Sequence, residues 1–385
     1  MRIGFDSKRL YCNFTGLGNY SRSLVKNVQA LYSDNKYFLY SPKINKTPET
    51  TFFYHNKNFK TYLAKTFFKA YWRSFSILNQ LKKDGVQLYH GLSNELPVNL
   101  KKHDIKSVVT IHDLIFKVLP ETYPLIDRNI YDYKFRKACL QADKVIAISN
   151  STKNDIVNFY NINPDKIEVI YQSCSPLFYK PIEQQESISL NDQYNLPNQY
   201  LLSVGSIEKR KNLKLIIESY QHLDPEHKLP LVIIGRGKQY KREVVDLILL
   251  KRLENKVIWI TDNKCNETLR AIYQKATMLI YPSFYEGFGL PIVEALLSKT
   301  PVITSNISSL PEAGGPNSLY VNPNSPGELA HAITQVLTDT KLRTTMIDEG
   351  FKYANQMFSP NRVTKQLVSC YKEILNDKKL YKTTN

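Results

Sequence analysis

The sequence predicts an α/β protein built from two domains, each with a mostly parallel sheet. Short apolar runs alternate with segments of helical spacing along the chain, a pattern typical of parallel sheets covered by helices. The alternation stops between residues 175 and 198, where prolines and a Glu/Gln cluster indicate a linker, and then restarts. A length of 385 residues suits two or three domains. We therefore expect domains at 1–178 and 179–360, followed by a helical segment at 361–385.

The composition favours a globular protein of a reducing compartment. The five cysteines are scattered and no Cys-x-x-Cys occurs, so neither a disulfide framework nor a zinc site is indicated. The first residues, Met1 to Asp6, lack the apolar core of a signal peptide, and no run reaches the roughly 18 apolar residues of a membrane span. We expect a cytoplasmic protein, or one held at the inner face of a membrane from outside the bilayer.

The positive charge is concentrated in the first half of the chain. Residues 1–180 carry 27 Lys and Arg against 14 Asp and Glu, a net charge of +13, whereas the remainder carries +4. Such a basic half favours nucleic acid, an anionic membrane surface or a phosphorylated substrate as partner. No zinc finger, heptad repeat or RNA-binding signature accompanies the charge. We therefore expect no nucleic-acid partner, and steep salt dependence of duplex binding would argue otherwise.

The first domain opens with one Rossmann-like unit. A short strand over 2–6 is followed by a loop over 14–21 that contains Gly16 and Gly18, and then by a helix with apolar spacing from Leu24 to Leu31. A helix that starts after a glycine loop directs its first N–H groups at an anion. The Gly-x-Gly-x-x-Ser spacing is not the full dinucleotide fingerprint, so an ordinary turn remains an equal interpretation.

Residues 57–81 have the spacing of a basic amphipathic helix. Aromatic and aliphatic side chains recur every three or four residues from Phe59 to Leu78, and Lys65, Lys69 and Arg73 form a stripe about opposite. Trp72 widens the apolar side. This pattern predicts a helix lying on an anionic membrane or contacting a lipid acceptor. The alternative is an ordinary surface helix with its aromatics packed inward.

Two histidines stand at the ends of successive predicted strands. His90 ends the strand over 86–90, and His112 follows the strand over 107–111. Ligands of open α/β sheets bind at the carboxyl ends of strands, which makes both histidines candidates for a site. Each could equally be structural.

The second half carries groups suited to an anion at successive strand ends. Ser206 follows the strand over 200–204, and a basic turn with Arg210 and Lys211 leads into the next helix. Two cations can neutralise a diphosphate, and an arginine can bind it through two parallel hydrogen bonds.

The stretch over 281–295 adds two carboxylates and a helix start. Glu286 precedes the glycines of a sharp turn, Pro291 suits a first helical position, and Glu294 is expected in the first turn. Carboxylates beside cations suggest a ligand with both hydroxyls and phosphates, such as a sugar nucleotide.

These motifs together resemble glycosyltransferase family 4. The resemblance rests on residues 205–212 (GSIEKRKN) and 282–295 (PSFYEGFGLPIVEA), in which two glutamates lie eight positions apart. Other motifs of the family follow in the expected order: Gly16-Leu17-Gly18, His112-Asp113, Ser149-Asn150-Ser151 and Leu310-Pro311-Glu312. Lys209 departs from the proline found in many relatives. The resemblance implies retaining enzymes of GT-B architecture, with two Rossmann-like domains facing a central cleft and a C-terminal helix that crosses back to the first domain.

The resemblance also implies a role for each matching residue. Glu286 would hold the hydroxyls of the donor sugar, Glu294 the ribose, and His112 the sugar near the reacting centre. Arg210 and Lys211 would bind the diphosphate, with Ser206 nearby and with the backbone N–H groups of Phe288, Gly289 and Leu290. Gly16 and Gly18 would close over the phosphates. The first domain would bind the acceptor and the second the nucleotide sugar. No Asp-x-Asp occurs, which agrees with a family that needs no metal or other cofactor.

The sequence therefore predicts a retaining hexosyltransferase of polysaccharide assembly that acts on a saccharide or lipid-linked acceptor. The motifs look most like bacterial mannosyltransferases, so GDP-mannose is the first donor candidate. UDP-glucose, UDP-galactose and UDP-N-acetylglucosamine remain open, because base selection is expected at the backbone of residues 261–263. A sugar-nucleotide binding protein without transfer activity is the other alternative.

Overall fold

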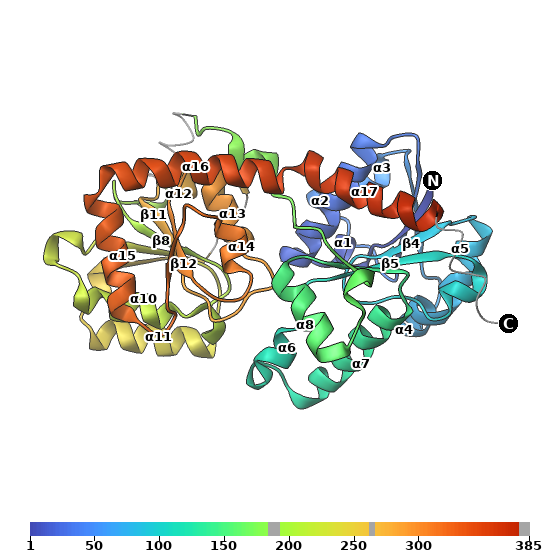
Figure 1. Ribbon diagram of the computed structural model, residues 1–385, viewed down its shortest axis with the longest axis horizontal. Coiled ribbons are helices and arrows are strands. Elements are labelled where there is room, and N and C mark those ends of the chain that lie inside the picture. The colour runs from blue at the N-terminus through green and yellow to red at the C-terminus, as the bar shows by residue number, and fades with distance from the viewer. Residues whose placement is uncertain (184–192, 262–265, 377–385) are drawn as a thin grey trace. The chain divides into compact units, whose positions relative to one another are not determined.

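The chain folds into two α/β domains. A computed structural model describes residues 1–183, 193–261 and 266–376. The first domain comprises Met1–Ser173 together with the last helix, α17 (Pro360–Asn376), and the second comprises Cys174–Ser359. Figure 1 shows helices flanking the strands of each domain. The prediction of two Rossmann-like domains, with the last helix belonging to the first, is confirmed.

The first domain is built on a parallel sheet of seven described strands in the order β3-β2-β1-β4-β5-β6-β7. The strands are β1 (Arg2–Asp6), β2 (Lys36–Ser41), β3 (Phe59–Leu63), β4 (Leu88–Gly91), β5 (Lys106–Ile111), β6 (Lys144–Ala147) and β7 (Ile167–Val169). Besides α17, its helices are α1 (Lys8–Cys12), α2 (Gly16–Leu31), α3 (Pro48–His55), α4 (Lys69–Tyr71), α5 (Ile77–Lys83), α6 (Ile115–Val118), α7 (Leu125–Gln141) and α8 (Asn150–Tyr160). A π-helical turn, η1 (Trp72–Ser76), joins α4 to α5.

The second domain repeats this plan with a parallel sheet of six described strands in the order β10-β9-β8-β11-β12-β13. The strands are β8 (Leu201–Val204), β9 (Leu231–Ile234), β10 (Val257–Ile260), β11 (Met278–Tyr281), β12 (Val302–Ser305) and β13 (Leu319–Val321). The helices are α10 (Leu213–Ser219), α11 (Gln239–Leu250), α12 (Asn266–Lys275), α13 (Leu290–Leu297), α14 (Leu310–Gly314), α15 (Pro326–Thr338) and α16 (Thr340–Phe358).

Each sheet has one point at which the strand order reverses. In the first domain this point lies between β1 and β4, and in the second between β8 and β11. Helices leave neighbouring strands in opposite directions there, so the loops separate and open a crevice at the carboxyl ends of the strands. This edge of each sheet is therefore where a ligand site is expected.

The core of the first domain includes the last helix. Val363, Leu367 and Tyr371 of α17 pack in one buried cluster with residues of β1 such as Ile3 and Phe5. In Figure 1, α17 lies beside α2, far from it in sequence. The apolar face at 363, 367, 371 and 374 has the four-residue spacing of a helix that buries one side, which explains why the sequence predicts this element well.

The helix predicted over 57–81 is wrong in its first part. Residues 59–63 form β3, whose Phe59 pairs with Tyr37 of β2, and helical structure begins only at Lys69. Apolar residues at 59 and 63 fit the two-residue period of a strand as well as the helical one, and pairing with an open sheet edge decides between them. Lys65 therefore lies outside the helix, and Lys65, Lys69 and Arg73 do not form a helical stripe.

The glycine loop predicted over 14–21 is shorter than expected, because α2 already begins at Gly16. The Asn13 side chain accepts hydrogen bonds from the N–H groups of Thr15 and Gly18, at 3.0 Å each, and so stabilises the start of the helix. A Cβ at position 18 would lie 1.7 Å from the Asn13 carbonyl oxygen, so this position requires glycine.

Two predictions fall partly outside the described residues. The linker over 175–198 includes 184–192, and the base-selecting segment over 261–263 includes 262 and 263. Within the described part of the linker, the short helical turn Pro176–Tyr179 follows Ser175, whose side chain accepts a hydrogen bond from the Leu177 N–H.

Candidate active site

The basic turn of the second domain follows β8 at the reversal point of its sheet. Lys209–Lys211 forms a single 3₁₀ turn, and Asn212 then adopts a left-handed conformation with φ of 56°. The Asn212 side-chain amide donates to the carbonyls of Pro282, at 3.2 Å, and Pro323, at 2.7 Å. These bonds fix the basic turn against the loop that follows β11.

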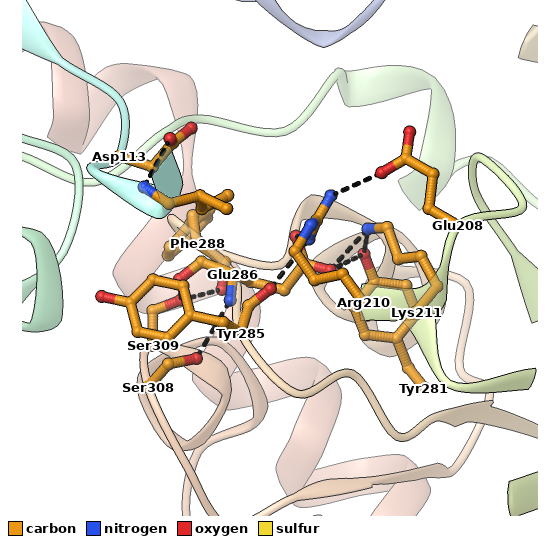
Figure 2. A network of polar contacts seen from close by, with 11 residues as sticks. Asp113, Glu208, Arg210, Lys211, Tyr281, Tyr285, Glu286, Phe288, Ser308 and Ser309 are labelled. Atoms are coloured by element: carbon orange, nitrogen blue, oxygen red, sulfur yellow. Dashed lines mark hydrogen bonds and ion pairs between the residues drawn. The ribbon is translucent and has the colours of Figure 1, made fainter. Parts of the chain in front are cut away.

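Glu286 lies between the two cations of this turn (Figure 2). Its Oε2 is 2.7 Å from an Arg210 terminal nitrogen, and its Oε1 is 2.5 Å from Lys211 Nζ. The Tyr281 hydroxyl donates to the same Oε1 at 3.1 Å and also contacts Lys211. Residues predicted from separate motifs, 75 and 76 positions apart, thus meet in one buried cluster.

The cluster is electrostatically arranged around an ionised carboxylate. Burial opposes ionisation, but Lys211 and Arg210 outweigh it and lower the pKa of Glu286 to about 2. Burial also lowers the pKa of the Lys211 ammonium, an effect that Glu286 partly offsets. For Arg210, burial is outweighed by Glu286 and the pKa is raised. The buried groups of the cluster are two cations and one carboxylate, whereas Glu208, which lies 3.4 Å from Arg210, is 55% exposed. The buried excess of positive charge suits an anionic ligand.

Backbone and serine contacts hold Glu286 in position. The Glu286 N–H donates to Ser308 Oγ at 3.1 Å, and the Ser309 hydroxyl donates to the carbonyls of Glu286 and Phe288 at 2.8 and 2.9 Å. The Arg210 guanidinium also donates to the Tyr285 carbonyl at 2.8 Å. Figure 2 shows both serines beneath the Glu286 loop. Apart from their place after a predicted strand, no sequence pattern indicates a role for Ser308 and Ser309.

The turn after Glu286 leads directly into α13. Gly289 precedes the helix with φ of 112°, a conformation that favours glycine, and Phe288 is buried. The helix starts at Leu290, so Pro291 is its second residue and Glu294 lies in the second turn, not the first as predicted. The N-terminal residues of α13 follow Glu286 closely in the chain, where N–H groups and the helix dipole favour negative charge.

Glu294 is separate from the Glu286 cluster in its contacts. It accepts a hydrogen bond from the Tyr273 hydroxyl of α12 at 3.1 Å. Burial raises the pKa of Glu294 to about 7, although the bond with Tyr273 works in the opposite direction. The two glutamates of the motif therefore differ in charge state: Glu286 is ionised, and Glu294 is half-protonated near neutral pH.

Ser206 lies near the basic turn. It lines a small pocket with Gly205, Lys211 and Tyr281. Gly205 has φ of 140°, and a Cβ there would approach the Lys211 side chain at 3.5 Å. The glycine thus suits the backbone turn that lets Ser206 and Lys211 approach each other.

His112, Gly16 and Gly18 belong to the first domain. The His112 ring is buried, with Nε2 2.9 Å from the Leu92 carbonyl and Nδ1 3.3 Å from the Gln172 amide nitrogen. Burial lowers the pKa of His112 to about 4, so the ring is neutral at pH 7 with its proton on the nitrogen that faces Leu92. The ring of Tyr20 packs edge-on against it at 4.7 Å between centroids.

His90, the other strand-end histidine, lies inside the first domain. Its Nδ1 is 2.5 Å from the Tyr371 hydroxyl of α17, and its Nε2 is 2.8 Å from Thr110 Oγ1. Burial lowers the pKa of His90 to about 3. These contacts favour the structural interpretation for this histidine.

A second ionic cluster, not predicted from the sequence, lies at the reversal point of the first sheet. Arg73 of η1 pairs with Asp6, the last residue of β1, and with Glu95 in the loop after β4, where its terminal nitrogen lies 2.5 Å from Oε2. Arg73, assigned from the sequence to a membrane-facing stripe, therefore points into the domain. Spacing alone could not reveal this pairing, since the three residues are far apart in the chain.

No described helix combines the length and apolar character needed to cross a membrane. Trp72, predicted to widen a membrane-facing surface, is half-buried and packs against a core cluster of the first domain. Lys65 and Lys69 are exposed.

Known protein families and individual proteins have sequences similar to this chain. The family of glycosyl transferases group 1 matches residues 186–353, and glycosyltransferase family 4 matches residues 14–174. The O-antigen chain mannosyltransferase B of Escherichia coli is 29% identical over 388 residues, covering 97% of this chain and 100% of that protein. The O-antigen chain mannosyltransferase RfbU of Salmonella typhimurium is 28% identical over 228 residues, 59% of this chain and 60% of that protein.

Solved structures share the fold over nearly the whole chain. Alr3699/HepE of Anabaena, crystallised in complex with UDP and glucose, superposes with a TM-score of 0.76 at 17% identity, covering 97% of this chain and 100% of that one. A glycosyltransferase of Rickettsia africae gives the same TM-score at 19% identity, with 98% and 99% coverage. The two matched family domains and this architecture show that the chain belongs to glycosyltransferase family 4, with the GT-B fold.

Proposed function

We propose that the chain transfers a hexose from a nucleotide sugar to a saccharide or lipid-linked acceptor in polysaccharide assembly, with GDP-mannose as the first donor candidate. The observation that carries the proposal is Glu286, held ionised between Arg210 and Lys211 at the reversal point of the second sheet. The choice of mannose is supported by the name of the Escherichia coli relative, which spans nearly the same length. The ligands of Alr3699/HepE keep a UDP-sugar donor as the alternative.

In this proposal the cationic and anionic side chains of the cluster bind different parts of the donor. Arg210 and Lys211 hold the diphosphate, and the backbone N–H groups of Phe288 and Gly289, together with that of Leu290 at the start of α13, add to the positive potential. Glu286 accepts hydrogen bonds from hydroxyls of the sugar. The cations stabilise the negative charge that develops on the leaving phosphate, an interaction worth about 3–4 kcal/mol for each well-placed donor.

Retention of configuration follows from attack of the acceptor hydroxyl on the face that the phosphate leaves. The bond from the anomeric carbon to the phosphate oxygen breaks, the acceptor oxygen bonds to that carbon, and its proton passes to the leaving phosphate. No enzyme nucleophile, metal or other cofactor is required in this scheme, because the two cations supply the positive charge. His112, with its neutral ring, would contact the donor sugar, and Gly16 and Gly18 would approach the phosphates.

Transfer assays and thermal shifts test the proposal together. Binding of a nucleotide sugar to the folded chain should raise its melting temperature, and GDP-mannose should do so more than UDP-glucose. Glu286→Gln should retain a thermal shift with the nucleotide diphosphate but lose transfer of the sugar. Undiminished transfer by Glu286→Gln would refute the role of this carboxylate. A larger thermal shift with UDP-glucose than with GDP-mannose would refute GDP-mannose as the donor and favour a UDP-sugar.

We also propose peripheral attachment to an anionic membrane surface in the cytoplasm. The segment before and within α4 exposes Phe67 fully and Phe68 largely, with Lys65 and Lys69 beside them in the chain. Aromatic side chains and lysines together suit the boundary between lipid headgroups and acyl chains. Reversing the charge of Lys65 and Lys69 should weaken binding to phosphatidylglycerol vesicles, and equal binding by the variant and the wild type would refute this attachment.

A further inference from the structure

The first domain contains a large groove that is separate in its lining from the clusters described so far, apart from Glu95. Its volume is about 480 Å³, within the range of about 300–1,000 Å³ typical of small-molecule sites. Phe75 of η1 forms one wall, Leu96 and Val98 a second, and Ile130 and Tyr133 of α7 the third. The groove is therefore mostly apolar along its length.

The walls are fixed by backbone and ionic contacts. The Val98 N–H donates to the Ser74 carbonyl at 2.8 Å, which joins the loop after β4 to the π-helical turn. Glu95 pairs with Arg73 of the same turn and with Lys134 of α7, whose Nζ is 3.6 Å from its Oε1. Glu95 thereby connects all three walls. A groove whose walls are linked in this way is formed before any ligand arrives.

Large apolar side chains remain exposed along α7 and η1. Ile126 is 73% and Tyr133 66% exposed on α7, and Phe75 is 44% exposed across the groove. Soluble domains seldom leave such neighbouring apolar side chains uncovered without a partner. Ile126 lies one helical turn before Ile130 on α7 and outside the lining, so it extends the apolar face beyond the groove, as a long hydrocarbon chain would require.

The charges at the groove favour an anionic occupant. Lys134 and Lys137 line it, and Lys137 Nζ donates to the Tyr133 hydroxyl at 3.2 Å. The carboxylate of Glu95 is the acidic group among the lining residues, and it is shared with the Arg73 guanidinium. The groove thus combines an apolar interior with an excess of positive charge, which matches a hydrocarbon chain that ends in a phosphate.

We infer that this groove binds the lipid end of the acceptor, a long-chain lipid phosphate or diphosphate, as a single molecule. The hydrocarbon chain lies against Phe75, Ile130 and Tyr133, and Lys137 and Lys134 contact the phosphate. This inference rests on the proposed function, because a lipid-linked acceptor is one of its two acceptor classes. It is distinct from attachment to a bilayer surface, which needs no groove.

Calorimetric titration with monomeric farnesyl phosphate tests the inference on the full chain. Ile130→Asn and Lys137→Gln should each weaken binding about tenfold or more, because the first removes an apolar contact with the hydrocarbon chain and the second a contact with the phosphate. Leu250→Asn is the matched control, because Leu250 is 75% exposed on α11 of the second domain and lies outside the groove. It should bind as the wild type does.

Three outcomes would overturn the inference. They are wild-type affinity in both groove variants, displacement of farnesyl phosphate by an equal concentration of inorganic phosphate, and binding that occurs with phosphatidylglycerol vesicles but not with the monomeric lipid. Farnesol should bind more weakly than farnesyl phosphate. Lys137→Gln is the more conservative variant should Ile130→Asn fail to fold.

A thermal shift with GDP-mannose or UDP-glucose separates the two proposals. Groove variants should keep the shift of the wild type, because none of the residues proposed to bind the nucleotide sugar lines the groove. If the nucleotide sugars bind and are used but lipid binding is insensitive to the groove, this inference fails and the proposed function stands. If no nucleotide sugar binds, the proposed function fails by itself.

Discussion

Each of the two domains has an ionic cluster at the equivalent position of its own sheet, and the two clusters have opposite charge compositions. Strand order 3-2-1-4-5-6 occurs in both, and each cluster joins the end of the first strand to the loop after the fourth. In the first domain one guanidinium, Arg73, faces two carboxylates, and in the second one carboxylate, Glu286, faces two cations. The same crevice of a doubly wound sheet can thus be closed by an internal ion network or prepared for an anion.

The difference lies in which charge is in excess. Asp6 and Glu95 are satisfied by Arg73, so the first cluster serves mainly to connect η1 to the sheet. Arg210 and Lys211 share one buried carboxylate, Glu286, and the second carboxylate near them, Glu208, is 55% exposed and lies 3.4 Å from Arg210. The buried part of the second cluster therefore has cationic capacity left for a ligand. We expect substitutions in the first cluster to affect stability most, and substitutions in the second to affect activity most.

The largest expected effect is on stability, from Arg73→Ala. Removing the guanidinium leaves the buried Asp6 carboxylate without its ionic partner and leaves Glu95 with Lys134 alone. The free energy of unfolding should fall by roughly 3–5 kcal/mol. The side chain of Arg73 is only 12% exposed, so water cannot replace the lost contacts. Chemical denaturation measures the change.

Lys60→Ala is the control for Arg73→Ala. Lys60 pairs with Asp84 at 3.3 Å, but its side chain is 63% exposed. Its loss should cost less than about 1 kcal/mol. Equal losses in the two variants would mean that the first cluster has no special structural role.

The next effect is on activity, from Lys211→Gln. The variant removes one of two cations facing the diphosphate and should lower kcat about 10²- to 10³-fold. Its unfolding free energy should change less than that of Arg73→Ala, because Arg210 still pairs with Glu286. Steady-state transfer assays and denaturation on the same preparation measure both quantities. A variant that loses stability but keeps kcat would reverse the comparison.

A smaller effect concerns the pH dependence of donor binding. Burial raises the pKa of Glu294 to about 7, so the carboxylate form that accepts from ribose hydroxyls grows as the pH rises. Donor binding should therefore tighten by about tenfold for each pH unit of increase up to pH 7 and level off above it. Tyr273 and Cys174 are the titratable neighbours with which Glu294 interacts, and burial raises the pKa of both well above neutrality. Glu294→Gln should flatten the profile, and an unchanged slope would assign the titration to another group.

Glu286 and Glu294 contribute to the free energy of unfolding with opposite pH dependence. The raised pKa of Glu294 adds stability below its unfolded pKa of about 4.5, and this contribution is lost as the pH rises to about 7. The lowered pKa of Glu286 adds stability above about 4.5, and this contribution is lost as the pH falls toward 2. Denaturation of each Gln variant across this range would separate the two.

The smallest effect is expected from Tyr371→Phe. It removes the hydroxyl that contacts His90 and should cost about 1 kcal/mol of unfolding free energy. Tyr133→Phe, which removes an exposed hydroxyl, should change stability by less than about 0.5 kcal/mol. A larger loss with Tyr133 than with Tyr371 would contradict the structural role given to His90.

The fold was predictable because its signals are local. Apolar runs such as 278–281 mark strands buried on both faces, and the spacing of 363, 367, 371 and 374 marks the last helix. The segment over 57–81 was not predictable in the same way. Its apolar spacing fits both the helical period and the two-residue period of a strand. The choice depends on the pairing of β3 with β2, which joins residues that are not neighbours in the sequence.

The cluster around Glu286 was predicted as a set of residues but not as a geometry. The motifs named Glu286, Arg210 and Lys211, whereas the direct contacts among them depend on the parallel pairing of β8 with β11. Tyr281, Ser308 and Ser309 add single hydrogen bonds that leave no periodic pattern in the sequence. The Arg73 cluster escaped prediction for the same reason, since Asp6, Arg73 and Glu95 meet only after the sheet has formed.

The position of α17 has a consequence for synthesis. Because α17 supplies part of the first domain's core, the second domain is in effect inserted into the first. The whole second domain is therefore synthesised before the final helix of the first domain. Domains generally fold as units during translation, so the second domain can mature first although it is encoded later. Until then Ile3 and Phe5 lack the cover of Leu367 and Tyr371, and the nascent first half is the part of the chain that would depend on a chaperone.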